Sequence, residues 1–345
     1  MIVNLREHVD LQPLNTLALP ARARYFCRVA SIEEIEAAVQ WARARQLPLL
    51  VLGGGSNVVL RGEWPGLVLQ IALLGKTLED IGGGARITVA AGENWHELVQ
   101  WTLQQRVYGL ENLTLIPGTV GAAPIQNIGA YGVELADFLE CVRGFSLTEN
   151  RSIELSAADC RLGYRDSIFK NALRGNFIVA EIVLRLRRDF APVLSYPALH
   201  ALRDIENLTA QRVESTVREL RQSKLPDPAQ LPNAGSFFKN PVLDAAHFAQ
   251  LQSAYPTLPS FAATSGVKIP AAWLVEHSGW KGRRHGQVGV HSQQAIVLVN
   301  FAGASADSAV GAELLELAAL IQADVLRKFA VTLELEPTVY GDTPG

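Results

Sequence analysis

Two glycine-rich stretches contain residues suited to binding a phosphate-bearing ligand. The first, Gly53-Gly54-Gly55-Ser56-Asn57, follows the short apolar run Leu49–Leu52. Glycines let backbone N–H groups approach a phosphate without a Cβ in the way, and the Ser and Asn side chains add donors. The run is not G-x-G-x-x-G and no helical pattern opens behind it, so a Rossmann dinucleotide site is disfavoured. By itself the run is equally consistent with a tight turn between strands.

The second stretch runs from Ile116 to Gly132 and alternates small residues with polar donors. It lies within a Gly/Pro/Ala-rich segment, 113–132, that lacks regular periodicity, and a loop of this length usually has a function. A flat or extended ligand could lie along its backbone, next to the side chains of Gln126, Asn127 and Tyr131. The alternative is a purely structural glycine-rich loop.

Three further segments contain residues that could stabilise charge or move a proton. Arg165, in Tyr-Arg-Asp-Ser, could clamp a carboxylate with both guanidinium nitrogens, although a surface arginine is the simpler interpretation. Ser236, in the predicted loop 233–241, has no G-x-S-x-G context for acyl transfer but could deliver a proton. Glu334 and Glu336 alternate on a predicted strand, so they share one face and are either solvated or available to a substrate.

A small cationic cluster precedes the Pro-rich stop 225–228. Arg221 and Lys224 are three residues apart on a predicted helix and therefore share a face. They could supply the local positive charge that an anionic ligand needs, or they could be ordinary surface residues. His285 and His291 lie near Arg283 and Arg284, but their spacing fits no zinc pattern, and we predict no metal site.

These motifs together resemble a known family. The two loops are similar to the FAD-binding domain of vanillyl-alcohol-oxidase-like (PCMH-type) flavoproteins. The sequence of residues 116–132 resembles that of the UDP-N-acetylenolpyruvoylglucosamine reductases of the longer-loop class. The resemblance extends from Asn15-Thr16 to Glu336. It implies an NADPH-dependent enzyme that uses FAD to reduce the enolpyruvyl group of UDP-N-acetylenolpyruvoylglucosamine to UDP-N-acetylmuramate in peptidoglycan synthesis. Neither loop contains a histidine, so the FAD is expected to be non-covalent.

The resemblance also assigns roles to residues. The first loop would hold the FAD pyrophosphate and the second the rest of the cofactor, with the contacts drawn from Gly53, Gly54, Gly55, Ser56, Asn57, Ile116, Pro117, Gly118, Thr119, Gly121, Ala122, Gln126, Asn127, Gly129, Tyr131 and Gly132. The catalytic residues would be Arg165, the proton donor Ser236, and Glu336. The substrate would be bound by Tyr196, Arg221, Lys224, Asn240 and Gln294. After Glu336, the residues Pro-Thr-Val-Tyr depart from the basic and apolar residues of the family, which leaves Glu336 dependent on the short Leu-Glu-x-Glu match.

Composition bounds the class of protein. The chain has 345 residues, 48% of them hydrophobic and 19% charged, with a formal net charge of −3. This predicts a compact globular protein without general attraction to nucleic acid or to an anionic membrane. The cysteines Cys27, Cys141 and Cys160 are widely spaced, which favours buried thiols over disulfides. The charged start of the chain and the absence of a long apolar run favour a cytoplasmic location; we also expect a monomer.

Periodicity predicts the elements that must position these residues. Strands are expected at 25–29, 49–52, 67–71, 87–90, 138–147, 177–186, 295–299 and 331–336. Helices are expected from Ser31, which has capping-box spacing to Glu34, and at 95–105, 209–223, 271–277 and 306–328. The elements predict an α+β fold, and the resemblance implies a PCMH-type domain at 1–188, in two subdomains split near residue 70. The remainder, 189–345, is a hinge region and a substrate-binding domain.

Other functions remain open on the residues alone. A flavin oxidase of the same fold would use O₂ and a small alcohol or sugar. A non-catalytic nucleotide-binding protein would contain no flavin. An acyl hydrolase using Ser236 would react with a fluorophosphonate.

Overall fold

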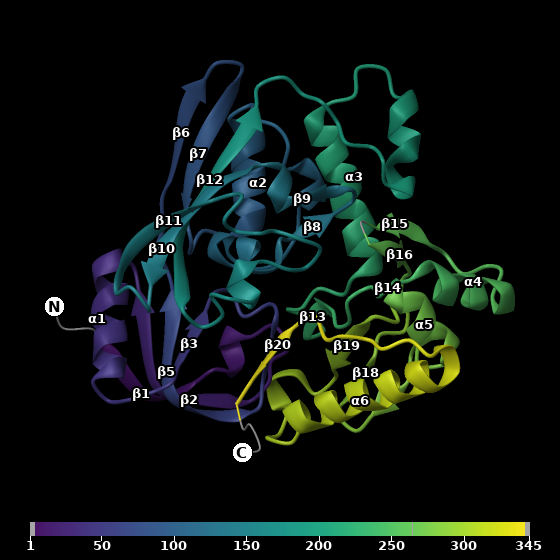
Figure 1. Ribbon diagram of the computed structural model, residues 1–345. Helices are drawn as coiled ribbons and strands as arrows, with labels where there is room; N and C mark the ends of the chain where they lie inside the picture. Colours follow the sequence, from purple (N-terminus) through teal and green to yellow (C-terminus); the bar gives the residue numbers. More distant parts are fainter. Residues whose placement is uncertain (1–3, 264, 342–345) are drawn as a thin grey trace. The chain divides into compact units, whose positions relative to one another are not determined.

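The computed structural model describes residues 4–263 and 265–341 (Figure 1). The chain forms two compact units whose segments alternate along the sequence. Unit 1 comprises residues 1–9, 23–55 and 64–223, and unit 2 comprises 10–22, 56–63 and 224–345. Unit 1 therefore continues past residue 188 and includes most of the helix that ends at Lys224. The limit of the FAD-binding domain at residue 188 remains a prediction.

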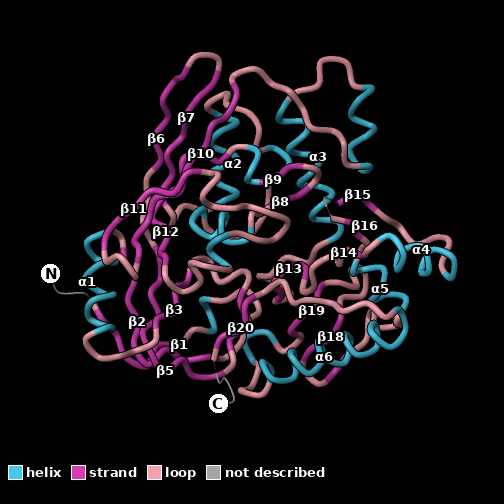
Figure 2. Tube along the Cα trace, in the orientation of Figure 1, coloured by secondary structure: helices cyan, strands magenta, loops and turns pink. Residues whose placement is uncertain are grey.

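Among the described residues, unit 1 contains two large sheets and a two-stranded sheet of β8 (Gly129–Ala130) and β9 (Val133–Glu134). The first large sheet has the strand order β1-β2-β5-β3. The second has the order β11-β10-β12-β7-β6, and all its neighbouring strands are antiparallel. The strands are β1 (Leu5–Asp10), β2 (Ala21–Val29), β3 (Leu49–Leu52), β5 (Gly62–Ile71), β6 (Lys76–Ile81), β7 (Gly84–Ala90), β10 (Leu139–Ser146), β11 (Arg151–Ser156) and β12 (Phe177–Arg187). Figure 2 shows β6 and β7 as long neighbouring strands, and β12 pairs with β7 on its other side. Sheet membership changes between Ile71 and Lys76, close to the predicted subdomain split.

The helices of unit 1 form where their local signals predict them. Helix α1 (Ile32–Arg43) begins with Ser31 Oγ accepting from Glu34 N (3.3 Å), while Glu34 Oε2 accepts from Ala30 N (2.6 Å). This reciprocal pair is the predicted capping box. Helix α2 (Trp95–Gln104) and helix α3 (Ala210–Lys224) match the predicted ranges to within one residue at each end. One face of α1 and of α2 packs into a continuous core shared with both sheets.

Unit 2 is built on three small sheets and three helices. Its strands are β13 (Asn233–Ser236), β19 (Val297–Asn300), β18 (Val288–Val290) and β17 (Arg284–His285) in one sheet, β14 (Val242–Leu243), β16 (Gly266–Lys268) and β15 (Phe261–Ala263) in the second, and β4 (Val58–Leu60) with β20 (Thr338–Tyr340) in the third. Helices α4 (Ala245–Ala254), α5 (Ala271–His277) and α6 (Val310–Phe329) complete the unit. Leu17, Leu19 and Val59 join its apolar core, which is why segments from the start of the chain belong to it.

Three sequence expectations for unit 2 are wrong in detail. The segment 331–336 forms no strand; only Leu335 makes an isolated bridge, to Phe238. The backbone N–H of Glu336 donates to Phe237 O (3.0 Å) and that of Thr338 to Asn57 O (3.0 Å). Pro337, which has no N–H, lies where the chain changes partner, so one ladder ends and β20 begins beside β4.

The other two corrections concern the ends of elements. The predicted loop 233–241 begins as strand β13, whose residues Asn233 and Ser236 pair with Val299 and Val297 of β19. Helix α6 begins at Val310 rather than at 306, because Asp307 Oδ1 accepts from Ala309 N (2.9 Å) and forms a local turn that competes with the helix.

All three cysteines are buried and unpaired. Burial raises the pKa of the Cys27 and Cys141 thiols to about 11 and that of Cys160 to about 12. The thiolate, which is the nucleophilic form, is therefore scarce at neutral pH. In the described part of the chain, no helix combines the length and the apolar character needed to cross a bilayer.

Candidate functional site

The two glycine-rich loops of the sequence meet within unit 1. A Cβ built on Gly53 would lie 2.5 Å from Thr119 Oγ1, and one built on Gly54 would lie 3.0 Å from the Cα of Gly118. A side chain at Gly53 would require the Thr119 hydroxyl to move, and one at Gly54 would press against the backbone of Gly118. The tertiary structure thus joins two motifs, about sixty residues apart, into one glycine-lined backbone surface.

The second loop is tied to the sheet through Gly121. Its N–H donates to Ala91 O (2.8 Å), just beyond the end of β7, at the start of the 3₁₀ turn Val120–Gln126. A Cβ on Gly121 would lie 2.5 Å from the Cβ of Ala91 and 3.1 Å from its Cα. Only glycine lets the loop approach the strand in this way.

A Gly121→Ala substitution is therefore expected to displace the second loop. Overpacking of this kind costs about 1–3 kcal/mol, and the purified variant should retain less flavin than the wild type. Gly82→Ala is the matched control, because a Cβ at Gly82 meets nothing within 4 Å. The comparison needs denaturant unfolding and the ratio of flavin to protein absorbance; equal flavin contents in the two variants would contradict the assigned role of the loop.

Asn127 serves mainly to shape the second loop. It is fully buried and has a left-handed backbone (φ 46°). Its Nδ2 donates to Glu134 Oε2 (2.8 Å) and to Gly163 O (3.0 Å), and its Oδ1 accepts from Ala136 N (3.0 Å). Both Nδ2 hydrogens are therefore used within the protein, and the predicted contact of Asn127 with a cofactor remains a proposal.

Arg165 lies directly against the same loop. It occupies a left-handed backbone position (φ 52°) in a tight turn closed by reciprocal backbone bonds between Gly163 and Asp166. Its Nη2 donates to Gly129 O (2.7 Å) and its Nη1 to Asn127 O (3.4 Å). A strained backbone that aims an arginine at a glycine-rich loop is typical of a functional position.

Arg221, on α3, faces the same part of unit 1. Burial lowers the pKa of its guanidinium, Tyr131 acts in the opposite direction, and Arg165 lowers the pKa further. Its Nε is buried and has no hydrogen-bond partner within the described chain. Arg165 and Arg221 are close enough to interact, so positive charge is concentrated in this region of unit 1, which favours an anionic ligand.

The predicted substrate residue Tyr196 also lies at this end of the second loop. Its ring packs edge-on against Tyr131, with the centroids 5.0 Å apart. The backbone oxygens of Tyr131 and Val193 both accept from Asn112 Nδ2, at 2.8 and 2.9 Å. Unit 1 thus collects Arg165, Arg221, Tyr131 and Tyr196 from segments far apart in the sequence.

Ser236 and Glu336 occur together in unit 2. Ser236 ends β13 and follows Gly235, whose left-handed backbone (φ 69°) is held by Asn233 Oδ1 (2.9 Å from Gly235 N). The next residue, Phe237, forms backbone hydrogen bonds to two other segments. Its N–H donates to Ile296 O (2.8 Å), and its oxygen accepts from Glu336 N. The two predicted catalytic residues of this unit therefore lie on hydrogen-bonded segments.

The end of the first glycine-rich run also belongs to unit 2. Asn57 Nδ2 donates to Glu336 O (3.4 Å), and its backbone oxygen accepts from Thr338. Ser56 and Asn57 thus separate from Gly53–Gly55 in the packing. Sequence reasoning placed all five residues at a phosphate, and it missed the link between Asn57 and Glu336 because nothing local indicates a contact between residues 279 positions apart.

The remaining predicted substrate residues are distributed over unit 2. Asn240 Oδ1 accepts from Ala271 N (2.9 Å) at the start of α5, so part of its side chain is used to begin that helix. Gln294 precedes β19 and its backbone oxygen accepts from Val297 N (3.0 Å). Lys224 is exposed at the last residue of α3, one turn after Arg221. Within the described ranges 4–263 and 265–341 there is no cluster of three or more potential metal ligands.

Sequence reasoning also missed His96, which supports the strained start of the second loop. Leu115 has a left-handed backbone (φ 54°), and its N–H donates to His96 Nδ1 (3.2 Å). Nδ1 must be unprotonated to accept this bond. Burial lowers the pKa of His96, with Arg218 acting in the same direction and Glu214 and Glu97 opposing it.

The lowered pKa of His96 predicts a pH dependence. The neutral imidazole contributes its full stabilisation above the unfolded pKa of about 6.5 and loses it as the pH falls through the lower folded pKa. Wild-type stability should therefore fall between roughly pH 7 and pH 5 more than that of a His96→Asn variant, whose Oδ1 can accept the same bond without titrating. Urea unfolding over that range tests this, and parallel curves for the two proteins would rule it out.

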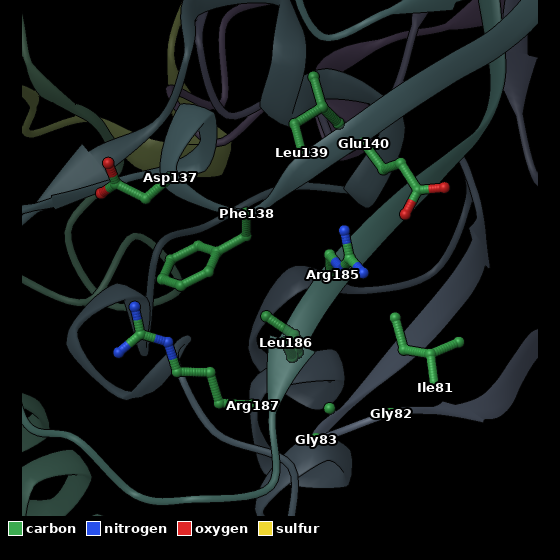
Figure 3. A pocket seen from close by; sticks show the side chains of 11 residues that line it. Ile81, Gly82, Gly83, Asp137, Phe138, Leu139, Glu140, Arg185, Leu186 and Arg187 are labelled. Atoms are coloured by element: carbon green, nitrogen blue, oxygen red, sulfur yellow. The ribbon is translucent and has the colours of Figure 1, made fainter.

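A separate groove of unit 1 contains none of the predicted site residues. It has a volume of about 460 Å³ and lies beside the turn Gly82-Gly83-Gly84, with Phe138 and the β12 residues Arg185 and Arg187 along it (Figure 3). Asp137 and Glu140 also line it, so acidic groups balance its two arginines. Glu140 is moreover paired with Arg86 (2.9 Å). This balance gives the groove no preference for an anion, and we assign it no cofactor.

Comparison with known proteins supports both units. Residues 23–150 match the family described as FAD binding domain, and residues 227–340 match the UDP-N-acetylenolpyruvoylglucosamine reductase C-terminal domain. A solved structure of UDP-N-acetylenolpyruvylglucosamine reductase (MurB) from Thermus caldophilus superposes with a TM-score of 0.68 at 25% identity, covering 99% of this chain and 100% of that one. The predicted α+β fold with a PCMH-type domain is thereby confirmed.

Curated relatives match along nearly the whole chain. The UDP-N-acetylenolpyruvoylglucosamine reductase of Paraburkholderia phymatum is 47% identical over 334 residues, 95% of each chain. That of Azoarcus sp. is 48% identical over 337 residues, again 95% of each, and that of Pseudomonas aeruginosa is 44% identical over 345 residues, 99% of this chain and 100% of the relative. Because identity of this extent runs through both matched domains, the chain belongs to the UDP-N-acetylenolpyruvoylglucosamine reductase family.

Proposed function

We propose that this chain reduces the enolpyruvyl group of UDP-N-acetylenolpyruvoylglucosamine to give UDP-N-acetylmuramate, with NADPH as reductant and non-covalent FAD as cofactor. The curated relatives carry this proposal, since they match both domains at 44–48% identity. The observation of the structure that supports it most is the pair of arginines, Arg165 and Arg221, beside a glycine-lined loop that a phosphate-bearing cofactor would fit.

The glycine-lined surface fits FAD. Gly53 lies against Thr119 and Gly54 against Gly118, so this part of the first loop has no side chains, and its backbone N–H groups would bind a pyrophosphate. The other predicted cofactor residues continue along the second loop to Gly132. When bound, FAD would supply the hydride chemistry that links NADPH to the terminal carbon of the enolpyruvyl group.

The residues of the chain would stabilise the negative charge that develops on the substrate and would donate one proton to it. Hydride addition to the terminal carbon leaves negative charge spread onto the substrate carboxylate. Arg165 would hold that carboxylate and stabilise the charge, with Glu336 as a second polar contact. Ser236 would then give its proton to the α-carbon, which completes the addition of hydride and proton across the double bond.

Binding of the nucleotide portion would rest on other groups. Arg221 and Lys224 would pair with the diphosphate, and Asn240, Gln294 and Tyr196 would add hydrogen bonds or packing. Since NADPH and a UDP-sugar are cytoplasmic metabolites, the enzyme would act in the cytoplasm. A monomer that binds neither nucleic acid nor membrane remains our expectation.

An anaerobic absorbance experiment tests the function directly. The purified protein should show a flavin spectrum that bleaches with NADPH and returns when the UDP-enolpyruvyl sugar is added without oxygen. Recovery only after admission of oxygen would favour a flavin oxidase. A colourless protein that takes up no FAD would overturn the proposal.

A further inference from the structure

Glu214, on α3, is a buried carboxylate that the proposed chemistry does not use. Its side chain is 4% exposed. Its Oε1 accepts from Gln100 Nε2 (2.7 Å) and from Thr114 Oγ1 (2.7 Å), and its Oε2 lies 3.5 Å from Arg218 Nη2. Burying a carboxylate is costly unless it is hydrogen-bonded and paired with a cation, so these partners are what allow Glu214 to be buried.

The contacts of Glu214 join three segments of unit 1. Gln100 lies on α2, one turn after His96, so the two share a face of that helix. Thr114 is fully buried at the start of the second loop and lies 3.1 Å from His96 Nδ1. The next residue is Leu115, whose left-handed backbone is held by the same imidazole nitrogen. Glu214 therefore connects α3 to the residues that lead into the second glycine-rich loop, where Leu115 has a left-handed backbone.

Glu214 and Arg221 lie on one face of α3. They are seven residues apart, with the buried Val217 between them, which is about 10 Å along the axis. A bond at Glu214 thus sets both the rotation and the axial position of the helix that presents Arg221. The buried Nε of Arg221 has no hydrogen-bond partner among the described residues, so no bond at that atom fixes the side chain.

We infer that Glu214 is a positioning residue. It fixes α3 to Thr114, just before the second glycine-rich loop, and thereby holds Arg221 in place for the substrate diphosphate. This inference rests on the proposed function, in which Arg221 contacts substrate and the loop contacts FAD. Glu214 itself touches neither. Its acceptor oxygens matter more than its charge, because both close partners are neutral donors.

The test uses the full-length flavin-loaded enzyme and three substitutions. Glu214→Leu removes both acceptors, Glu214→Gln restores an acceptor at the same position, and Glu219→Leu makes the same change at an exposed position of the same helix. We expect Glu214→Leu to raise the KM for the UDP-enolpyruvyl sugar about tenfold, the effect of losing one hydrogen bond of this kind. The rate of flavin reduction by NADPH should stay within about twofold of the wild type, Glu214→Gln should recover most of the KM, and Glu219→Leu should behave as the wild type.

A second variant covers the case in which Glu214→Leu does not fold. Thr114→Val removes only the hydroxyl that Glu214 accepts and should also raise the KM for the sugar, by a few-fold. An unchanged KM in a folded Glu214→Leu or Thr114→Val enzyme, with only a lower melting temperature, would show a merely structural role and overturn the inference. The proposed function fails separately, if the wild-type enzyme does not turn over the sugar at all.

Discussion

A Ser236→Ala enzyme is expected to be reduced by NADPH at the wild-type rate and to lose the substrate half-reaction. Ser236 is the proposed donor of the proton to the α-carbon, and removal of a general acid costs about 10²–10⁴-fold in rate. The residue lies at the end of β13, where Gly235 and Asn233 set the local backbone, and this arrangement does not depend on the hydroxyl. Rapid mixing under anaerobic conditions separates the two half-reactions.

Ser253→Ala is a suitable control for Ser236→Ala. Ser253 is an exposed residue of α4, and its loss should leave both half-reactions unchanged. If Ser236→Ala slowed flavin reduction and flavin reoxidation equally, the serine would be acting on the structure or on the cofactor, and its assignment as proton donor would be wrong.

An Arg165→Ala enzyme is expected to bind FAD but to reduce the UDP-enolpyruvyl sugar about 10²–10³-fold more slowly, the loss typical of removing one preorganised group that stabilises developing charge. Arg165→Lys should recover only part of the rate. A lysine keeps the positive charge but lacks the planar fork that donates to Gly129 O and Asn127 O while facing an anion. Single-turnover reoxidation of the reduced flavin by the sugar measures this step.

Arg161→Ala is the matched control for Arg165→Ala. Arg161 has the same residue type and a similar left-handed backbone (φ 47°, against 52° for Arg165), four residues earlier, and it is exposed. Any cost of placing alanine at such a backbone position is therefore common to both variants. A comparable loss of rate in Arg161→Ala would remove the case for a specific charge-stabilising role of Arg165.

Local signals in the sequence predicted the longest strands and most of the helices, but not helix α4 or shorter strands such as β1, β6 and β11. Strand β3 and helix α5 occupy the predicted residues, and the capping box at Ser31 and Glu34 forms as expected. These features depend on neighbours within a few positions, where periodicity and capping chemistry decide the outcome. The segment 331–336 was mispredicted because its alternation is real but its hydrogen-bond partners change at Pro337.

The sequence by itself determined the family, the α+β class and the residue types available for the chemistry, because motifs such as 116–132 and 233–241 are contiguous. Only the tertiary structure decided which of them meet. It brought Gly53 and Gly54 against Gly118 and Thr119, and Asn57 to Glu336, and it buried Glu214 beside Thr114. Such contacts join residues from about sixty to almost three hundred positions apart, and they arise from burial of a common core and satisfaction of its polar groups, which no local pattern encodes.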